Sequence, residues 1–177
     1  MTMSRRSVLG AGLGGALALL TPRRARATGV PLRRLSTGEA SVLEALGERL
    51  VPGAAAAGIA HYVDQQLAAP VGEALLMIRY LGVNPPYEPF YHAGLAALDA
   101  LARTSHRKSF ADLEPTAADA LVSQIAKGSP KGWGGPPANF FYFVVRADAV
   151  DVVYGVKPGF AKLDVPYMAH IEPPARW

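Results

Sequence analysis

The chain has 177 residues and no cysteine, which is enough for one domain with a real core and excludes disulfides, thiolate zinc sites, iron–sulfur clusters and thioether-bound haem. Its formal net charge is +4, but residues 1–27 hold five of the 18 Lys and Arg residues and none of the 14 Asp and Glu residues. The remainder therefore lacks the basic surplus expected of a nucleic-acid-binding domain.

Residues 1–27 have the pattern of an export signal. Arg5 and Arg6 precede the apolar stretch Val8–Leu20, and alanines occupy positions 25 and 27. A positive start, a short apolar segment and an A-x-A ending predict cleavage after Ala27. The paired arginines indicate the twin-arginine route to the periplasm. A membrane span is disfavoured, because 13 residues make a helix of only about 20 Å, against a hydrocarbon core of roughly 30 Å.

After an extended lead-in over residues 28–35, the sequence predicts a series of helices. Ser36 and Glu39 form a capping-box pattern at the start of the first helix. Apolar residues three and four positions apart predict helices over 39–51, 58–67, 70–81, 89–104 and 116–127. In the third of these, we expect the core to receive Val71, Leu75, Ile78 and Leu81. The alanines at 54–57 are expected to be a linker.

The last predicted helix spans residues 140–155, with Asn139 as its cap. Strand propensity is high in its first half, but the charged residues interrupt it without alternation, so we expect a helix. Because it is apolar nearly all round, it is either a central core helix or one shared between the core and a partner. Residues 156–177 combine four prolines with apolar side chains, so this segment either wraps its own domain or lies across another protein.

These observations predict an all-α fold, an irregular bundle of about six helices with an extended, Pro- and aromatic-rich C-terminal tail. The expected domains are a signal at 1–27, a helical domain at 28–155 and an interface tail at 156–177.

Candidate catalytic groups are few. His61 and Asp64 are one helical turn apart and could form a hydrogen-bonded pair, for which a structural role is the commoner one. Asp148 and Asp151 could cooperate as acid and base, but such pairs more often bind arginine or face water. We find no metal-ligand, nucleophile or phosphate-binding motif in a suitable context, so we assign this chain no catalytic, cofactor or metal residue. His170 is the best histidine for an interface contact.

The order and spacing of several segments resemble the gluconate 2-dehydrogenase subunit 3 family. These segments are the twin-arginine leader, Leu43–Pro52, Gly58–Leu67, Phe140-Phe141 and Val153-Tyr154-Gly155. The resemblance implies a non-catalytic small subunit that escorts and stabilises an FAD-containing large subunit of a sugar or alcohol dehydrogenase. The twin-arginine translocase and a cytochrome c subunit are the other implied partners, and the substrate stays open.

We expect the last helix and the tail to contact the flavoprotein. The predicted interface residues are Phe140, Phe141, Tyr154, Phe160, Tyr167, His170 and Trp177. Two other functions remain open: a stand-alone periplasmic helical enzyme that uses His61/Asp64 or Asp148/Asp151, and a membrane-tethered adaptor whose leader is never cleaved.

Overall fold

A computed structural model describes residues 20–163 of the chain. These residues contain eight α-helices, two short 3-10 helices and no strand, which confirms the predicted all-α class. The elements in chain order are α2 (Pro22–Ala27), α3 (Thr37–Leu50), α4 (Ala54–Ala57), α5 (Ile59–Ala68), η1 (Met77–Leu81), α6 (Glu88–His106), η2 (Phe110–Asp112), α7 (Pro115–Lys127), α8 (Ala138–Tyr154) and α9 (Lys157–Lys162).

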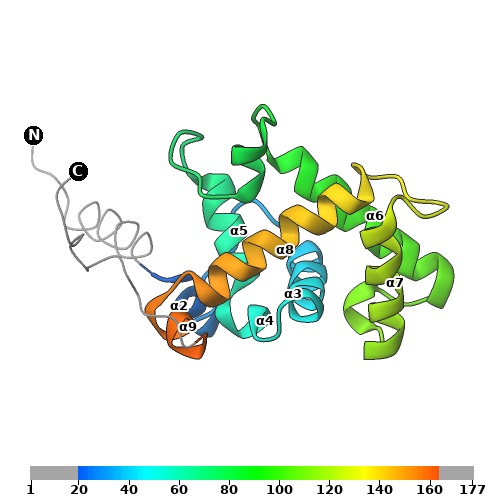
Figure 1. Cartoon of the computed structure of the whole chain (residues 1–177), viewed down its shortest axis with the longest axis horizontal. Coiled ribbons are helices and arrows are strands. Elements are labelled where there is room, and N and C mark those ends of the chain that lie inside the picture. Colours follow the sequence, from blue (N-terminus) through cyan, green and yellow to red (C-terminus); the bar gives the residue numbers. More distant parts are fainter. Residues whose placement is uncertain (1–19, 164–177) are drawn as a thin grey trace, which may run out of the picture.

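Helix α8 crosses the middle of the molecule, and the other helices pack around it (Figure 1). It contacts α3, α4, α5, α6, α7, α9 and η1. Phe141, Val144, Val145 and Ala149 are fully buried, so more than one side of the helix faces the core. This arrangement explains why a segment with strand-like composition is helical: neighbours on several sides bury its apolar side chains.

The start of α8 differs from the prediction. The helix begins at Ala138, and Pro137 occupies the N-cap position, with no side-chain cap. Asn139 is already inside the first turn, where its side chain accepts a hydrogen bond from the Phe140 N–H at 3.0 Å. Proline replaces the expected cap because a residue without an N–H leaves one donor fewer to satisfy at a helix start.

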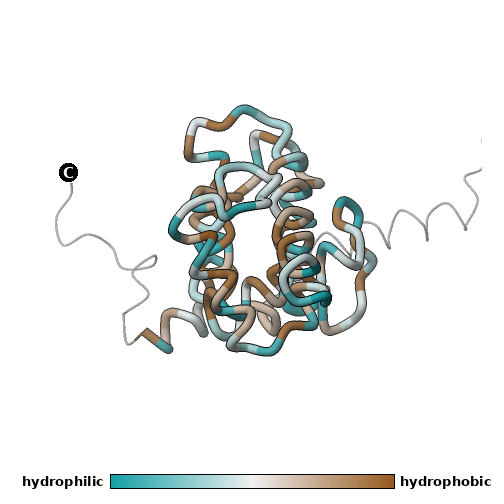
Figure 2. Tube along the Cα trace, turned by 90° about the vertical axis from the view of Figure 1, so that its right-hand side faces the viewer, coloured by the Kyte–Doolittle hydropathy of each residue, from teal (hydrophilic) through white to brown (hydrophobic). Residues whose placement is uncertain are grey.

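Phe141 is a core residue, which corrects its assignment to the interface. Its ring is fully buried and lies against Gly94 of α6, where an added Cβ would come within 2.3 Å of ring atoms. Trp133 packs beside it, with ring centroids 6.0 Å apart, and its indole N–H donates to the Pro136 carbonyl at 2.5 Å. Figure 2 shows apolar, brown segments along the packed helices, while the outer turns contain both polar, teal and apolar, brown segments.

Five of the six predicted helices are present, with ends within two residues of the expected ones. The capping box of α3 is confirmed: the Glu39 N–H donates to Ser36 Oγ at 3.2 Å, and Ser36 N–H donates to Glu39 Oε2 at 2.8 Å. Proline at the start of α6 and of α7 fits the first turn, where a missing N–H costs nothing.

Residues 70–81 do not form the predicted helix. A turn follows Pro70, residues 74–76 form an irregular segment in which Leu76 is extended, and only the short 3-10 helix η1 follows. Ile78 is buried, but Val71, Leu75 and Leu81 are exposed. Two side chains of α5 hold this irregular segment in place. Gln66 accepts a hydrogen bond from the Leu75 N–H at 2.7 Å, and the Tyr62 hydroxyl donates to the Leu75 carbonyl at 3.1 Å. These tertiary hydrogen bonds hold the backbone in a non-helical conformation. Most of the apolar side chains at helical spacing stay exposed, so their burial does not stabilise a helix here.

The alanine linker at 54–57 is instead the helix α4. It is flanked by Gly53 and Gly58, whose φ angles of 94° and 85° suit glycine. The Glu48 carboxylate accepts from the N–H groups of Gly53 and Ala55 at 2.9 and 3.1 Å, and so supplies the acceptor that the short helix lacks.

Both ends of the described chain are also helical. The first part of the tail forms α9 and packs on α8, so it is not extended as predicted. Residues 22–27, predicted as the end of the export signal, form α2, which packs on α5 and α4.

Candidate partner-binding surface

A groove of about 770 Å³ lies where the first and last described helices meet. Its walls come from α2, α4, α5, α8, α9, η1 and the segment that leads into η1. Most of its lining is apolar, including Pro22, Leu75, Val152 and Val156. Arg23, Asp151 and Lys162 add charges of both signs. This composition, apolar with a few polar groups, is that of a binding site.

Large apolar side chains are exposed around this groove and along α8. Leu75 and Tyr80, which line it, are 54% and 62% exposed. On α8, Phe143 and Val150 are 47% and 38% exposed; they are seven residues apart and so lie on one face of the helix. We refer to Phe143, Val150, Leu75 and Tyr80 as the α8–η1 surface. Phe143 and Val150 are exposed on α8, and Leu75 and Tyr80 are exposed at the groove, so each pair offers apolar area that a partner could cover.

The predicted interface residues take several positions. Phe140 is partly buried and packs edge-on against Phe90, with centroids 5.5 Å apart. Tyr154 and Phe160 are partly buried near the groove end of α8. Tyr167, His170 and Trp177 lie outside the described residues, as do Arg5 and Arg6. Phe143 and Val150 were not identified as surface residues from the sequence. The helix is apolar nearly all round, so its sequence does not show which side remains exposed to solvent.

Asp148 is buried on the side of α8 that contacts η1. Its buried carboxylate accepts from the Met77 N–H at 2.9 Å and from the Tyr91 hydroxyl at 2.6 Å. It thereby ties η1 and α6 to α8. Burial raises the pKa of Asp148 to about 7, and the two hydrogen bonds offset only part of that effect. Burial beside Asp148 also raises the pKa values of Tyr91 and Tyr62.

The two aspartates of α8 therefore have separate surroundings. Asp148 is held in the core by its two donors, while Asp151 lines the groove, where partial burial raises its pKa. Asp148 is engaged in holding the fold, while Asp151 faces the groove and its charge adds to the raised pKa of Asp148.

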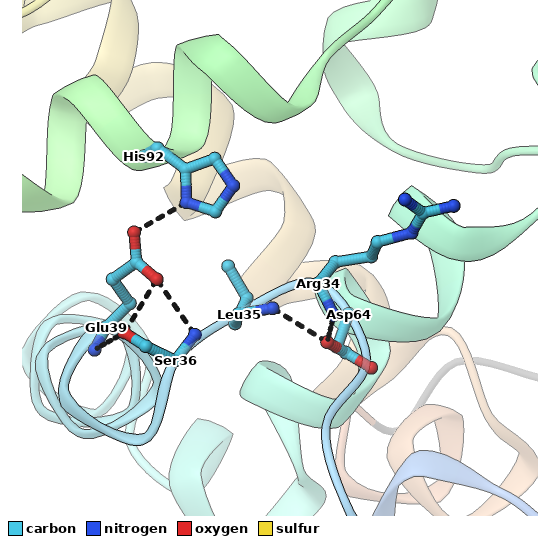
Figure 3. Close-up of polar contacts among 6 residues, drawn as sticks. All are labelled: Arg34, Leu35, Ser36, Glu39, Asp64 and His92. Carbon is cyan, nitrogen blue, oxygen red and sulfur yellow. Dashed lines mark hydrogen bonds and ion pairs between the residues drawn. The ribbon is translucent and has the colours of Figure 1, made fainter.

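His61 and Asp64 do not pair with each other. The Asp64 carboxylate accepts from the N–H groups of Arg33, Arg34 and Leu35 at 2.7–3.0 Å. The His61 Nε2 lies 3.0 Å from the Val30 carbonyl oxygen. Both residues therefore hold the lead-in segment, residues 28–35, against α5. Figure 3 shows this for Asp64 with Arg34 and Leu35.

His92 also has a structural contact. Its Nδ1 lies 2.5 Å from Glu39 Oε1, so the carboxylate that closes the capping box of α3 also joins α6 (Figure 3). The pKa of Glu39 is lowered: burial opposes this, but hydrogen bonds from Ser36 and His92 outweigh burial.

Over residues 20–163, no group of three His, Asp or Glu side chains is placed to hold a metal ion. Within the same part of the chain, none of the helices combines the length and apolar character needed to cross a bilayer.

Comparisons with known proteins identify the family to which the chain belongs. No curated protein and no solved structure matches it. A family model described as gluconate 2-dehydrogenase subunit 3 matches residues 37–170, from the first turn of α3 to beyond α9. Since that match covers well over half of the sequence, the chain belongs to the gluconate 2-dehydrogenase subunit 3 family.

Proposed function

We propose that this chain is the non-catalytic small subunit of a periplasmic, flavin-dependent sugar or alcohol dehydrogenase complex. Its twin-arginine signal, with Arg5 and Arg6, exports the folded complex, and its helical domain stabilises the FAD-containing large subunit. The FAD belongs to that partner, and a cytochrome c subunit completes the complex.

The observation that carries this proposal is the exposure of the four apolar side chains of the α8–η1 surface, of which Leu75 and Tyr80 line the groove. These four side chains are 38–62% exposed, so complete burial of each one by a partner would contribute roughly half of the 1.5–3 kcal/mol that burial of a fully exposed side chain gives. A subunit that is permanently bound in a complex gains that free energy when the complex assembles. The family name, which describes a dehydrogenase subunit, supports a dehydrogenase as the partner.

The same structure argues against a stand-alone enzyme. Asp64 and His61 bind the lead-in, and Asp148 binds η1 and Tyr91, so three of the four candidate catalytic groups are engaged in holding the fold.

A charge placed in the α8–η1 surface tests the proposal. Phe143→Glu is expected to abolish co-purification of a flavin-bearing dehydrogenase with the affinity-tagged chain, because a partner that covers this position would have to desolvate the new carboxylate. Ala120→Glu, at an exposed position of α7 outside that surface, is the matched control and should retain the flavoprotein. Flavin fluorescence and dye-linked dehydrogenase activity of the eluate are the measurements. Undiminished flavin with Phe143→Glu would falsify this docking surface.

Export is tested separately. With Arg5→Lys and Arg6→Lys together, both this chain and the flavoprotein should accumulate in the cytoplasm, because the twin-arginine pair is the address for both. Fractionation of cells followed by immunoblotting measures this. Periplasmic flavoprotein in the double variant would rule out the escort role.

A further inference from the structure

Helix α2 is built into the domain. Ala25 is fully buried, and α2 packs on α5 and α4. The Thr21 hydroxyl accepts from the Arg24 N–H at 3.4 Å and caps the helix. The Val30 N–H donates to the Ala25 carbonyl at 2.9 Å, which fixes the turn that follows.

Two contacts hold α2 against its neighbours. The Arg26 guanidinium binds the Glu44 carboxylate of α3 through two hydrogen bonds of 2.8 and 3.1 Å. At Gly58, an added Cβ would come within 2.4 Å of the Pro22 carbonyl oxygen, so the backbones of α2 and the α4–α5 junction touch there. Such a close approach is possible only with glycine.

This packing conflicts with the predicted processing site. A signal peptidase requires small side chains at the third and first positions before the cut, here Ala25 and Ala27, and proteases bind such segments in extended form. In the folded chain these residues are helical, and Ala25 is inaccessible. Protein carried by the twin-arginine route folds before it meets the peptidase.

We propose that folding protects the Ala25–Ala27 site from signal peptidase, so that residues 21–27 stay on the domain as a permanent wall of the groove. Pro22 and Arg23 line that groove, and cleavage after Ala27 would remove them. The inference rests on the proposed function only in that residues 25–27 are the cleavage site of the export signal.

Purified signal peptidase tests this without any transport step. The substrates are the folded full-length chain and a synthetic peptide of residues 16–34, which cannot make the α2 contacts with α3 and α5. Intact-mass analysis should show cleavage of the peptide after Ala27 and none of the full chain. Cleavage of the folded chain after Ala27 overturns the proposal. An uncut peptide overturns it too, since the site would then need no protection.

Two glycines provide a matched pair of variants. Gly58→Ala places its Cβ against Pro22, whereas Gly53→Ala has a similar positive φ but nothing within 4 Å of the new Cβ. Gly58→Ala should raise the cleavage rate by about tenfold or more, because cleavage follows the population of the opened state. Gly53→Ala should stay protected.

Glu44→Gln covers the case in which Gly58→Ala fails to fold, because it weakens the Arg26 contact and leaves the cleavage site unchanged. It should also speed cleavage. If Gly58→Ala and Glu44→Gln both fold and both resist signal peptidase as well as the unchanged chain does, the proposal is contradicted. Failure of the export role appears instead in the fractionation of the arginine variant, so the two outcomes are distinguishable.

Discussion

At the scale of single residues, buried carboxylates do most of the positioning. Asp148 and Asp64 are the two buried charged residues of the described chain, and each accepts hydrogen bonds from another segment. Asp148 joins η1 and α6 to α8, while Asp64 joins the lead-in to α5. A buried carboxylate is tolerated only with such donors, so each one fixes the segment that supplies them.

Asp148 should make stability depend on pH. Its pKa is about 7 in the folded protein and about 3.9 in an unfolded chain. Between these values the folded state binds the extra proton, so the free energy of unfolding falls as pH rises from about 4 to about 7 and then levels off. Asp148→Asn should reduce this slope and leave the part that comes from Asp151, whose pKa is also raised, with Asp119→Asn at an exposed site as the control.

Urea unfolding of the three proteins between pH 5 and pH 8, a range chosen to bracket the upper part of that window, measures the effect. Glu39 and Asp99 have lowered pKa values, so their contribution is lost only at lower pH. An Asp148→Asn slope equal to that of the wild type would contradict the assignment.

Asp64→Ala should be severely destabilising. It leaves the N–H groups of Arg33, Arg34 and Leu35 without their acceptor, and we expect a loss of at least about 2–3 kcal/mol. Asp119→Ala, which removes only an exposed ion pair with Arg49, should cost no more than about 1 kcal/mol. Chemical denaturation compares them; equal losses would mean that the Asp64 contacts carry little free energy.

The spacing of His61 and Asp64 suggested a pair, and the structure shows why it misled. Each side chain instead contacts backbone about 30 positions earlier in the sequence. Side-chain spacing along one helix cannot show that a distant segment offers better partners.

At the scale of elements, the sequence was sufficient where local signals agreed. The capping box of α3 and the prolines of α6 and α7 marked helix starts that the structure confirms. The helix predicted over residues 70–81 is absent because Gln66 and Asp148, on other helices, accept hydrogen bonds from the backbone of this segment. The helix α4 was missed because its cap, Glu48, belongs to the helix before it.

The contact of α6 with α8 depends on Gly94. Gly94→Ala should destabilise the protein by about 1–3 kcal/mol, because the new methyl group overlaps the Phe141 ring and outweighs the gain in helix propensity. Gly38→Ala, in α3 with nothing within 4 Å of the added Cβ, should be neutral or stabilising by up to about 1 kcal/mol. Thermal unfolding measures both; a stabilised Gly94→Ala protein would disprove the tight contact.

At the scale of the whole molecule, the site was only partly predictable. The sequence indicated that α8 is apolar on all sides and that a partner could share it. Only packing shows which side remains uncovered, since α3 to α7 bury one set of residues and leave Phe143 and Val150 exposed. Phe141, adjacent in sequence to Phe140, was indistinguishable from a surface aromatic residue until Gly94 was placed against it.

The C-terminal residues belong to the same proposed interface. Deleting residues 164–177, which include Tyr167, His170 and Trp177, should leave α9 and the helical domain folded and abolish co-purification of the flavoprotein. Circular dichroism checks the fold, and flavin in the affinity eluate checks binding. Full flavin recovery from the truncated chain would remove the tail from the interface.

The meeting of α2 and α9 at one groove has a practical consequence. Sequence inserted into the elements that line this groove would compete with the partner for space. Residues 105–108, exposed after the main body of α6, are the better insertion point, because loop tips without buried backbone accept added sequence.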